Sequence, residues 1–253
     1  MRAPTAGERM LIDLGISEPK EIDLEAIACC HGAFVEYEPL DGCEAMIVGD
    51  DKHAIITVNS RSGDERRRFS VAHEIGHWHL HRGKRLFCSA VDIGNPRHDV
   101  LNPERQADDF ASDLILPDFM VRPRAMKIRK VTIAAVDELA GEFSASRTAT
   151  LIKLARLDRF PIMLVCHDRN GLRWWSPQNR FAGWWRPSRR LDSQTYAYEM
   201  LFNGADDPHP HKMPGDAWFD FRGADRDEVT EQSFRLPGDQ VLTILTLPER
   251  AVA

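Results

Sequence analysis

Apolar positions in the first 125 residues follow two different spacings. Short apolar runs at 33–37, 45–48 and 53–59 predict strands, and the turn between the last two indicates a hairpin. The segments 64–80 and 102–117 instead repeat apolar residues at helical intervals, each behind a residue that can cap a helix. This alternation predicts one mixed domain of helices and strands.

Two short helices are predicted in the next segment. Thr132 can cap a first helix that Gly141 ends, and Ser144 or Ser146 can begin a second helix that continues through Leu157. Two short helices around a tight turn are typical of a helix-turn-helix. A pair that only packs as a bridge between domains has the same pattern, so both interpretations stay open.

Strand patterns return after Pro161. Apolar runs at 162–166 and 172–175 flank a turn, a last strand is predicted at 240–245, and a loop-rich stretch lies between. We therefore predict an α+β protein of three parts, which are a mixed domain at 1–125, a helical linker at 126–159 and a β-rich domain at 160–253.

The composition, 43% hydrophobic and 28% charged, is that of a globular protein and excludes a mainly disordered or fibrous chain. No apolar run approaches the roughly 20 residues that span a bilayer, and the N-terminus lacks the apolar core of a signal peptide. We therefore expect a cytoplasmic protein with no membrane partner. The five cysteines include no C-x-x-C pair, which argues against a disulfide framework.

Charge is distributed unevenly along the chain. The net charge is 33 − 39 = −6, yet residues 122–190 hold 15 Lys or Arg and 5 Asp or Glu, a balance of +10. Basic stretches attract nucleic acid, so this part of the chain keeps a nucleic-acid partner under consideration.

The strongest chemical signal is H-E-I-G-H at residues 73–77, an H-E-x-x-H pattern on a predicted helix. Residues four apart share one face of a helix, so His73 and His77 can bind the same zinc ion. Glu74 lies beside them and can act as the general base that takes a proton from the attacking water. His81 lies near His77 around the helix and is a candidate to contact the side of His77 that faces away from the metal.

A catalytic zinc needs a third protein ligand and an open position. Glu104 and Asp108 lie four residues apart at the start of the next predicted helix, so both can face the metal helix. Glu104 would complete a two-histidine, one-glutamate site, and Asp108 would accept the proton on the far nitrogen of a ligand histidine. A solvated helix face is the alternative for each acid.

Two separated blocks of the chain resemble the ImmA/IrrE family of zinc metallopeptidases. Residues 68–81 read R-F-S-V-A-H-E-I-G-H-W-H-L-H, and residues 104–117 read E-R-Q-A-D-D-F-A-S-D-L-I-L-P. The second block of the family is approximately E-x-x-A-N-x-F-A-x-x-L-L-M-P, so Asp108 stands where Asn is usual. Either side chain accepts a hydrogen bond, which preserves the supporting role.

The resemblance implies a gluzincin-like peptidase domain with one Zn²⁺ per chain on His73, His77 and Glu104, and with Glu74 as general base. It also implies an endopeptidase that cuts a helix-turn-helix repressor and thereby derepresses phage, defence or DNA-damage genes. The later segments are similar to the helix-turn-helix-like linker and the GAF-like sensor domain of IrrE-like and CapP-like members.

In such a peptidase the substrate lies extended along an exposed strand, and residues 53–59 are our candidate for that edge. An interior strand would show the same apolar pattern.

Cys88, between the two zinc-bearing helices, is a candidate inhibitory ligand of the zinc. Its thiolate can fill the fourth zinc position and silence the enzyme, as the resemblance to CapP-like members implies, or it can be a small buried apolar residue.

Aromatic and basic residues interleave in the β-rich domain. Aromatic rings stack on unpaired bases while arginines follow phosphates, so this pattern suits single-stranded DNA, which the CapP-like resemblance also implies as an activator. A sheet core edged by solvated arginines is the alternative. The candidate residues are Arg173, Trp174, Trp175, Arg180, Trp184, Trp185, Arg186, Arg189 and Arg190.

Two rival functions use the same residues without proteolysis. One is a DNA-binding transcriptional regulator with a structural zinc site, and the other is a zinc protein that only binds its partner. A structural zinc is normally closed by four protein ligands, and it leaves Glu74 without a chemical purpose. The number of zinc ligands and the behaviour of the Glu74→Gln variant therefore distinguish a peptidase from these two rival functions.

Overall fold

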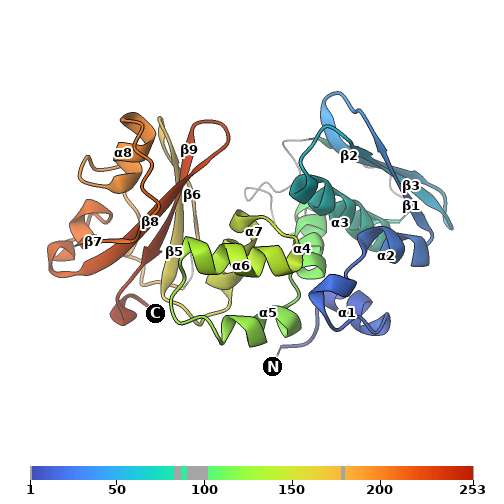
Figure 1. Ribbon diagram of the computed structural model, residues 1–253, viewed down its shortest axis with the longest axis horizontal. Helices are drawn as coiled ribbons and strands as arrows, with labels where there is room; N and C mark the ends of the chain where they lie inside the picture. The colour runs from blue at the N-terminus through green and yellow to red at the C-terminus, as the bar shows by residue number, and fades with distance from the viewer. Residues whose placement is uncertain (1, 83–86, 90–101, 178–179, 253) are drawn as a thin grey trace. The chain divides into compact units, whose positions relative to one another are not determined.

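The computed structural model describes residues 2–82, 87–89, 102–177 and 180–252 (Figure 1). The chain forms two compact units. Unit 1 contains residues 1–127 and 139–149, and unit 2 contains residues 128–138 and 150–253. Within the described ranges, no helix is both long enough and apolar enough to cross a membrane.

Unit 1 has the mixed architecture that the apolar spacing predicts. Its helices and strands are α1 (Ala6–Asp13), a 3-10 turn (Pro19–Glu21), α2 (Leu24–Cys30), β1 (Ala33–Glu38), β2 (Cys43–Gly49), β3 (Ala54–Asn59), α3 (Asp64–Leu80), β4 (Phe87–Ser89), α4 (Pro103–Ile115) and α5 (Asp118–Ala125). The four strands form one sheet in the order β1-β3-β2-β4. The pair β1–β3 is parallel, and the other pairs are antiparallel.

The predicted hairpin is confirmed as β2–β3, but the expected substrate edge at 53–59 is wrong. β3 pairs with β1 on one side and with β2 on the other, so its backbone is occupied along both edges. Apolar content alone could not reveal this, because the order of strands depends on the parallel pairing of β3 with β1, and the segment between these two strands contains β2. Among the described strands, the edges of this sheet are β1 and β4.

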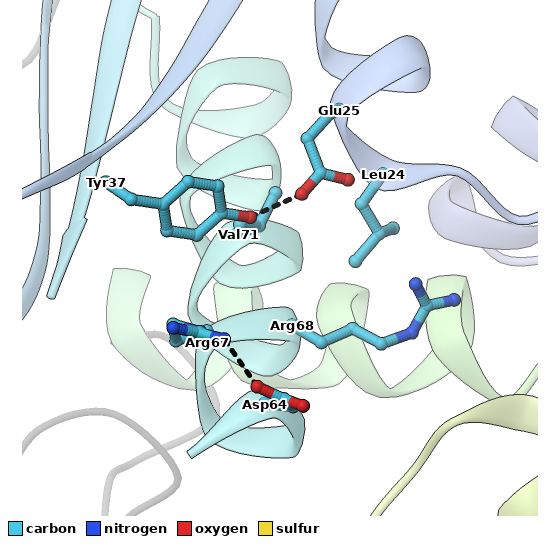
Figure 2. A pocket seen from close by; sticks show the side chains of 7 residues that line it. All are labelled: Leu24, Glu25, Tyr37, Asp64, Arg67, Arg68 and Val71. Carbon is cyan, nitrogen blue, oxygen red and sulfur yellow. Dashed lines mark hydrogen bonds and ion pairs between the residues drawn. The ribbon is translucent and has the colours of Figure 1, made fainter. Parts of the chain in front are cut away.

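Helix α3 is held against α2 and β1 by contacts in the first turns of the helix. These elements line an open hollow of about 460 Å³, and Figure 2 shows the side chains that line it. The Tyr37 hydroxyl donates to Glu25, Arg67 pairs with Asp64, and Arg68 Nη2 donates to the Ile22 carbonyl at 2.8 Å. The candidate metal ligand His73 lies on another side of the helix, because Val71, which lines this hollow, is about 200° around the helix from position 73.

The two helices predicted after residue 130 are present as α6 (Ile133–Phe143) and α7 (Arg147–Arg156). The expected caps are confirmed, since Thr132 Oγ1 accepts from the Ala135 amide and Ser146 Oγ accepts from the Ala149 amide. Gly141, however, does not end α6, which continues to Phe143. A single glycine weakens a helix by about 1 kcal/mol relative to alanine, which the rest of the helix offsets.

Unit 2 is built on a five-stranded antiparallel sheet in the order β6-β5-β9-β8-β7. Its elements are β5 (Ile162–Asp168), β6 (Gly171–Ser176), α8 (Tyr196–Phe202), β7 (His211–Pro214), β8 (Glu228–Leu236), β9 (Gln240–Thr246) and 3-10 turns at Gly215–Ala217, Ala224–Arg226 and Glu249–Ala251. An aromatic-rich core with Trp185, Trp218 and Phe219 fills the side that carries α8.

The stretch expected to be loop-rich contains α8, β7 and β8. The apolar pattern does not predict β8, because the middle of this strand is buried yet polar, with Glu231, Gln232 and Ser233 in sequence. Glu231 is buried and accepts hydrogen bonds from the amides of Tyr196 and Ala197 at the start of α8. A buried polar strand has no apolar signature, so only the tertiary partners identify it.

Candidate metal centre

Helix α3 presents both histidines of the motif to the interior of unit 1. The helix begins after Gly63 with Asp64 and Glu65 in its first turn, where acidic side chains stabilise the positive end of the helix dipole. His73 and His77 are buried one turn apart, and their Nε2 atoms lie 3.0 Å from each other. The two imidazoles therefore converge on one point.

Helix α4 supplies the third group. Asn102 caps this helix by accepting from the Glu104 amide at 2.9 Å, which fixes Glu104 in the first turn. The Glu104 carboxylate lies 3.3 Å from His73 Nε2 and 3.4 Å from His77 Nε2. One ligand atom from each of the three residues falls within a 4.8 Å cluster. Two nitrogens and one oxygen at this spacing fit a divalent cation.

The far side of each ligand histidine is also engaged. His73 Nδ1 lies 2.9 Å from Asp108 Oδ1, which is the place expected for Asp108. His77 Nδ1 lies 3.1 Å from His81 Nδ1, and His81 Nε2 lies 2.9 Å from Gln106 Oε1. Such outer hydrogen bonds fix the tautomer and the orientation of metal-binding imidazoles. Sequence reasoning missed Gln106, which belongs to no motif and is brought to His81 only by the packing of α4 on α3.

The histidines and the acids of the cluster stabilise each other's charged forms. Burial lowers the pKa of His73, but hydrogen bonds to Asp108 and Glu104 outweigh it and raise that pKa to about 9. Burial alone would raise the pKa of Glu104, yet its hydrogen bonds to His73 and His77 hold it well below its ordinary value. The site therefore favours positive charge at the point where the three side chains meet, and a metal cation satisfies the same preference.

Glu74 is fully buried on α3 beside the two histidines. Its charge reaches the start of β2, where the pKa of the Cys43 thiol is raised by burial and by the nearby Glu74 carboxylate. Cys88 lies in β4, and its backbone pairs with Ala45 of β2. The side chain of Cys88 falls outside the described part of the structure, so its role as an inhibitory fourth ligand stays a prediction.

The aromatic residues proposed for nucleic acid separate into two groups. Trp184 is exposed over 62% of its surface, whereas Trp185 is 2% exposed and packs edge-on against Phe219. The expectation that Trp185 stacks on a base is therefore wrong, because its ring belongs to the core of unit 2. Trp174 and Trp175 are half-buried along β6.

The candidate arginines divide in the same way. Arg180 has a side chain that is only 8% exposed, donates to the Ala155 carbonyl at 3.2 Å and pairs with Asp158, so it is a structural residue. Arg173 pairs with Asp168. The exposed arginines of the predicted set are Arg173, Arg186, Arg189 and Arg190.

Two hollows share the exposed Trp184. One of about 690 Å³ is lined by Arg186 and Arg189, and the other, of about 420 Å³, is lined by three arginines that the sequence did not single out. These three are Arg222, Arg226 and Arg250. They lie 32 or more residues beyond the predicted basic segment, so linear charge patterning could not associate them with Trp184.

Comparisons with known proteins agree on one family. The family model of the IrrE N-terminal-like domain, peptidase family M78, matches residues 28–155. The metallopeptidase ImmA of Bacillus subtilis (strain 168) is 30% identical over 104 residues, which is 41% of this chain and 58% of that protein. The match therefore spans less than two thirds of the length of that relative.

A solved structure is similar over nearly the whole chain. It is a transcriptional regulator of Mycobacterium tuberculosis, which aligns with a TM-score of 0.59 and 14% identity over 96% of this chain and 74% of its own. At this identity the likeness concerns the fold. Together with the candidate metal cluster of α3 and α4, the family match shows that the chain belongs to the ImmA/IrrE family of metallopeptidases.

Proposed function

We propose that this chain is a cytoplasmic zinc endopeptidase that cleaves a helix-turn-helix transcriptional repressor and thereby derepresses the genes under its control. The observation that carries the proposal is the convergence of His73, His77 and Glu104 beside the buried Glu74. Its relative ImmA is named as a metallopeptidase, which supports the same chemistry. The repressor as substrate follows from the family resemblance of the two sequence blocks.

The ligand count favours catalysis over a structural zinc. Among the residues that the structure describes, the cluster contains three ligands, whereas structural zinc sites normally use four. Three protein ligands leave one position for a substrate or water. The DNA-binding regulator with a structural zinc is therefore the second candidate, and the linker helices α6 and α7 are its main support.

Each residue of the site has a distinct role in peptide hydrolysis. A Zn²⁺ ion on His73, His77 and Glu104 would polarise the scissile carbonyl and make water a better nucleophile. Glu74 takes the proton from the attacking water and delivers it to the departing amine. Asp108 and the His81–Gln106 pair hold the two imidazoles in place through their outer nitrogens.

Glu74→Gln tests the proposal directly. The amide keeps the shape of the side chain but cannot take a proton, so we expect zinc to stay bound at one per chain while cleavage falls by about 10²–10⁴-fold. The measurement is the rate of cleavage of the repressor by mass spectrometry, with zinc content determined on the same sample.

Glu65→Gln is the matched control, because Glu65 is an exposed glutamate of the same helix. It should cleave at the wild-type rate. Cleavage by Glu74→Gln at the wild-type rate, or cleavage that persists after zinc is removed by a chelator, would refute the peptidase mechanism. Full repressor inactivation without any cut would favour the partner-binding alternative.

We further propose single-stranded DNA as the activating signal, with unit 2 as a GAF-like sensor. An exposed indole between two arginine-lined hollows supports this proposal, because Trp184 can stack on a base while arginines on both sides contact phosphates.

The variant Trp184→Ala should weaken binding of an oligothymidine strand by about 1–3 kcal/mol, the usual contribution of one stacked base. Fluorescence anisotropy at low and high salt measures it, and binding should fall as salt rises. Phe119→Ala, which removes a partly exposed ring from α5, is the control and should leave the affinity unchanged. Equal affinity of Trp184→Ala and the wild type would remove this signal from the mechanism.

A further inference from the structure

An apolar row crosses the outer face of the unit 1 sheet. Phe34 of β1 pairs in register with Ile55 of β3, and Ile55 pairs in turn with Val48 of β2. Side chains at paired positions of adjacent strands lie on the same face about 5 Å apart, so the three form one continuous row. Their exposed fractions are 52%, 50% and 64%.

This row lies on the face of the sheet opposite to the helices. The alternate residues Ala54, Ile56 and Val58 of β3 are buried, and α3 packs against β2 and β3 on that side (Figure 1). Successive residues of a strand point to opposite faces, so Ile55 faces away from α3. Single exposed apolar residues are common on protein surfaces, but a contiguous row marks an interaction site.

Acidic residues border the row on both sides. Glu36 and Glu38 continue the same face of β1, and the exposed Asp50 and Asp51 follow Val48 in the turn to β3. Over residues 33–59 there are six acids and one lysine, a balance of −5 with neutral histidine. Glu36 is held on this face by a hydrogen bond from Thr57 Oγ1 at 2.9 Å.

We propose that this surface binds an amphipathic helix whose apolar stripe is flanked by Lys and Arg, and that the helix belongs to the protein substrate. The inference rests on the proposed function, in which the substrate is a DNA-binding protein. Proteins that bind DNA carry basic surfaces, and an apolar row bordered by acids complements a basic amphipathic helix in both respects.

The surface would act as a docking site separate from the metal centre. The ligands His73 and His77 lie on α3, which packs on the other face of the sheet, so a helix bound to the row would lie on the opposite side of the sheet from these ligands. Docking would instead raise the local concentration of the substrate near the peptidase and would appear in affinity for the substrate rather than in the chemical step.

The experiment uses two synthetic 18-residue helical peptides with the same leucine face, one with Lys and one with Glu on the flanks. Binding to the full-length Glu74→Gln protein is measured by fluorescence anisotropy at several salt concentrations. We expect the Lys peptide to bind with a salt-sensitive affinity and the Glu peptide not to bind. Ile55→Ser and Val48→Ser should each weaken binding of the Lys peptide by about tenfold.

Ile12→Ser is the matched control, because Ile12 is a similarly exposed isoleucine on α1 in the same unit. It should bind like the parent protein. Zinc content and thermal melting of each variant show that folding is retained. Equal binding of both peptides, no binding of either, or unchanged binding by Ile55→Ser overturns the docking site.

Sedimentation of the free protein tests the other possible occupant of the row, which is a second copy of the chain. If the chain forms a dimer that Ile55→Glu dissociates, a second copy covers the row and the proposal is wrong. Cleavage of the repressor by the wild type is scored independently. Cleavage without peptide binding refutes the docking site alone, and peptide binding without any cleavage refutes the proposed function alone.

Discussion

The Asp108 carboxylate decides which nitrogen of His73 can bind a metal. A carboxylate only accepts, so Nδ1, 2.9 Å from Asp108, carries a proton, and Nε2, which faces His77 and Glu104, is the nitrogen left to bind a metal. An asparagine, which is usual in the family at this position, can accept the same bond through its carbonyl oxygen. The position therefore requires an acceptor more than it requires a negative charge.

Two substitutions separate these requirements. Asp108→Ala removes the acceptor and should weaken zinc binding by about 10–100-fold, whereas Asp108→Asn should remain within a few-fold of the wild type. Competition with a zinc-binding dye measures both affinities. Asp109→Ala, which removes a half-buried acid paired with Arg105 on the same helix, is the control. Equal losses in the Ala and Asn variants would show that the charge, rather than the hydrogen bond, supports the metal.

At the scale of elements, the metal centre depends on how closely α4 approaches α3. Gly76, between the two ligand histidines in sequence, faces Ala107 of α4. A Cβ atom at position 76 would lie 3.1 Å from Ala107 Cα and 3.2 Å from the Ala107 carbonyl oxygen. These are backbone atoms of a packed helix, so they can move only if α4 moves and carries Glu104 with it.

Gly76→Ala should therefore destabilise the protein by about 1–3 kcal/mol, although alanine is the better helix former. It should also weaken zinc binding, because Glu104 is displaced. Gly141→Ala in α6 is the matched control, since nothing lies within 4 Å of its Cβ, and it should stabilise by about 0.5–1 kcal/mol. Urea unfolding of both proteins measures the difference. A stabilised Gly76→Ala would mean that the two helices can separate without loss.

At the scale of the whole molecule, each unit has its own buried charged centre. In unit 1 it is the metal cluster, and in unit 2 it is Glu231 at the start of α8. Four donors surround the Glu231 carboxylate, which are the amides of Tyr196 and Ala197, the Trp218 indole at 3.1 Å and the Ser233 hydroxyl at 3.0 Å. Burial nevertheless outweighs these bonds and raises the pKa of Glu231 above its usual 4.5.

This raised pKa predicts the sign of a pH effect. The unfolded chain loses the Glu231 proton near pH 4.5, while the folded chain holds it to higher pH. The contribution of this residue to the free energy of unfolding therefore falls as pH rises from about 4.5 through the folded pKa, and it is constant above that. Glu231→Gln cannot titrate, so it supplies the reference.

Urea unfolding followed by tryptophan fluorescence between pH 4.5 and 7 tests this expectation. The free energy of unfolding of the wild type minus that of Glu231→Gln should decrease with rising pH. The variant should be less stable at pH 4.5, because one amide oxygen cannot serve all four donors. A difference that increases with pH would show that the hydrogen bonds prevail over burial.

Much of the metal centre was determined by the sequence alone. The H-E-x-x-H spacing places two imidazoles on one face of any helix, and the second block places Glu104 and Asp108 on one face of the next, because both depend only on the helical repeat. Caps at Asn102, Thr132 and Ser146 are equally local, since each bonds an amide two or three residues away. Local geometry of this kind transfers directly from sequence to structure.

The tertiary structure alone decided which strands are edges and which side chains are exposed. β3 is an interior strand, Trp185 is buried while its neighbour Trp184 is exposed, and Gln106 meets His81 across two helices. Each of these facts depends on partners that are distant in sequence, and apolar periodicity carries no information about them. For the same reason the apolar row on the outer face of the sheet emerges only from the register of three strands.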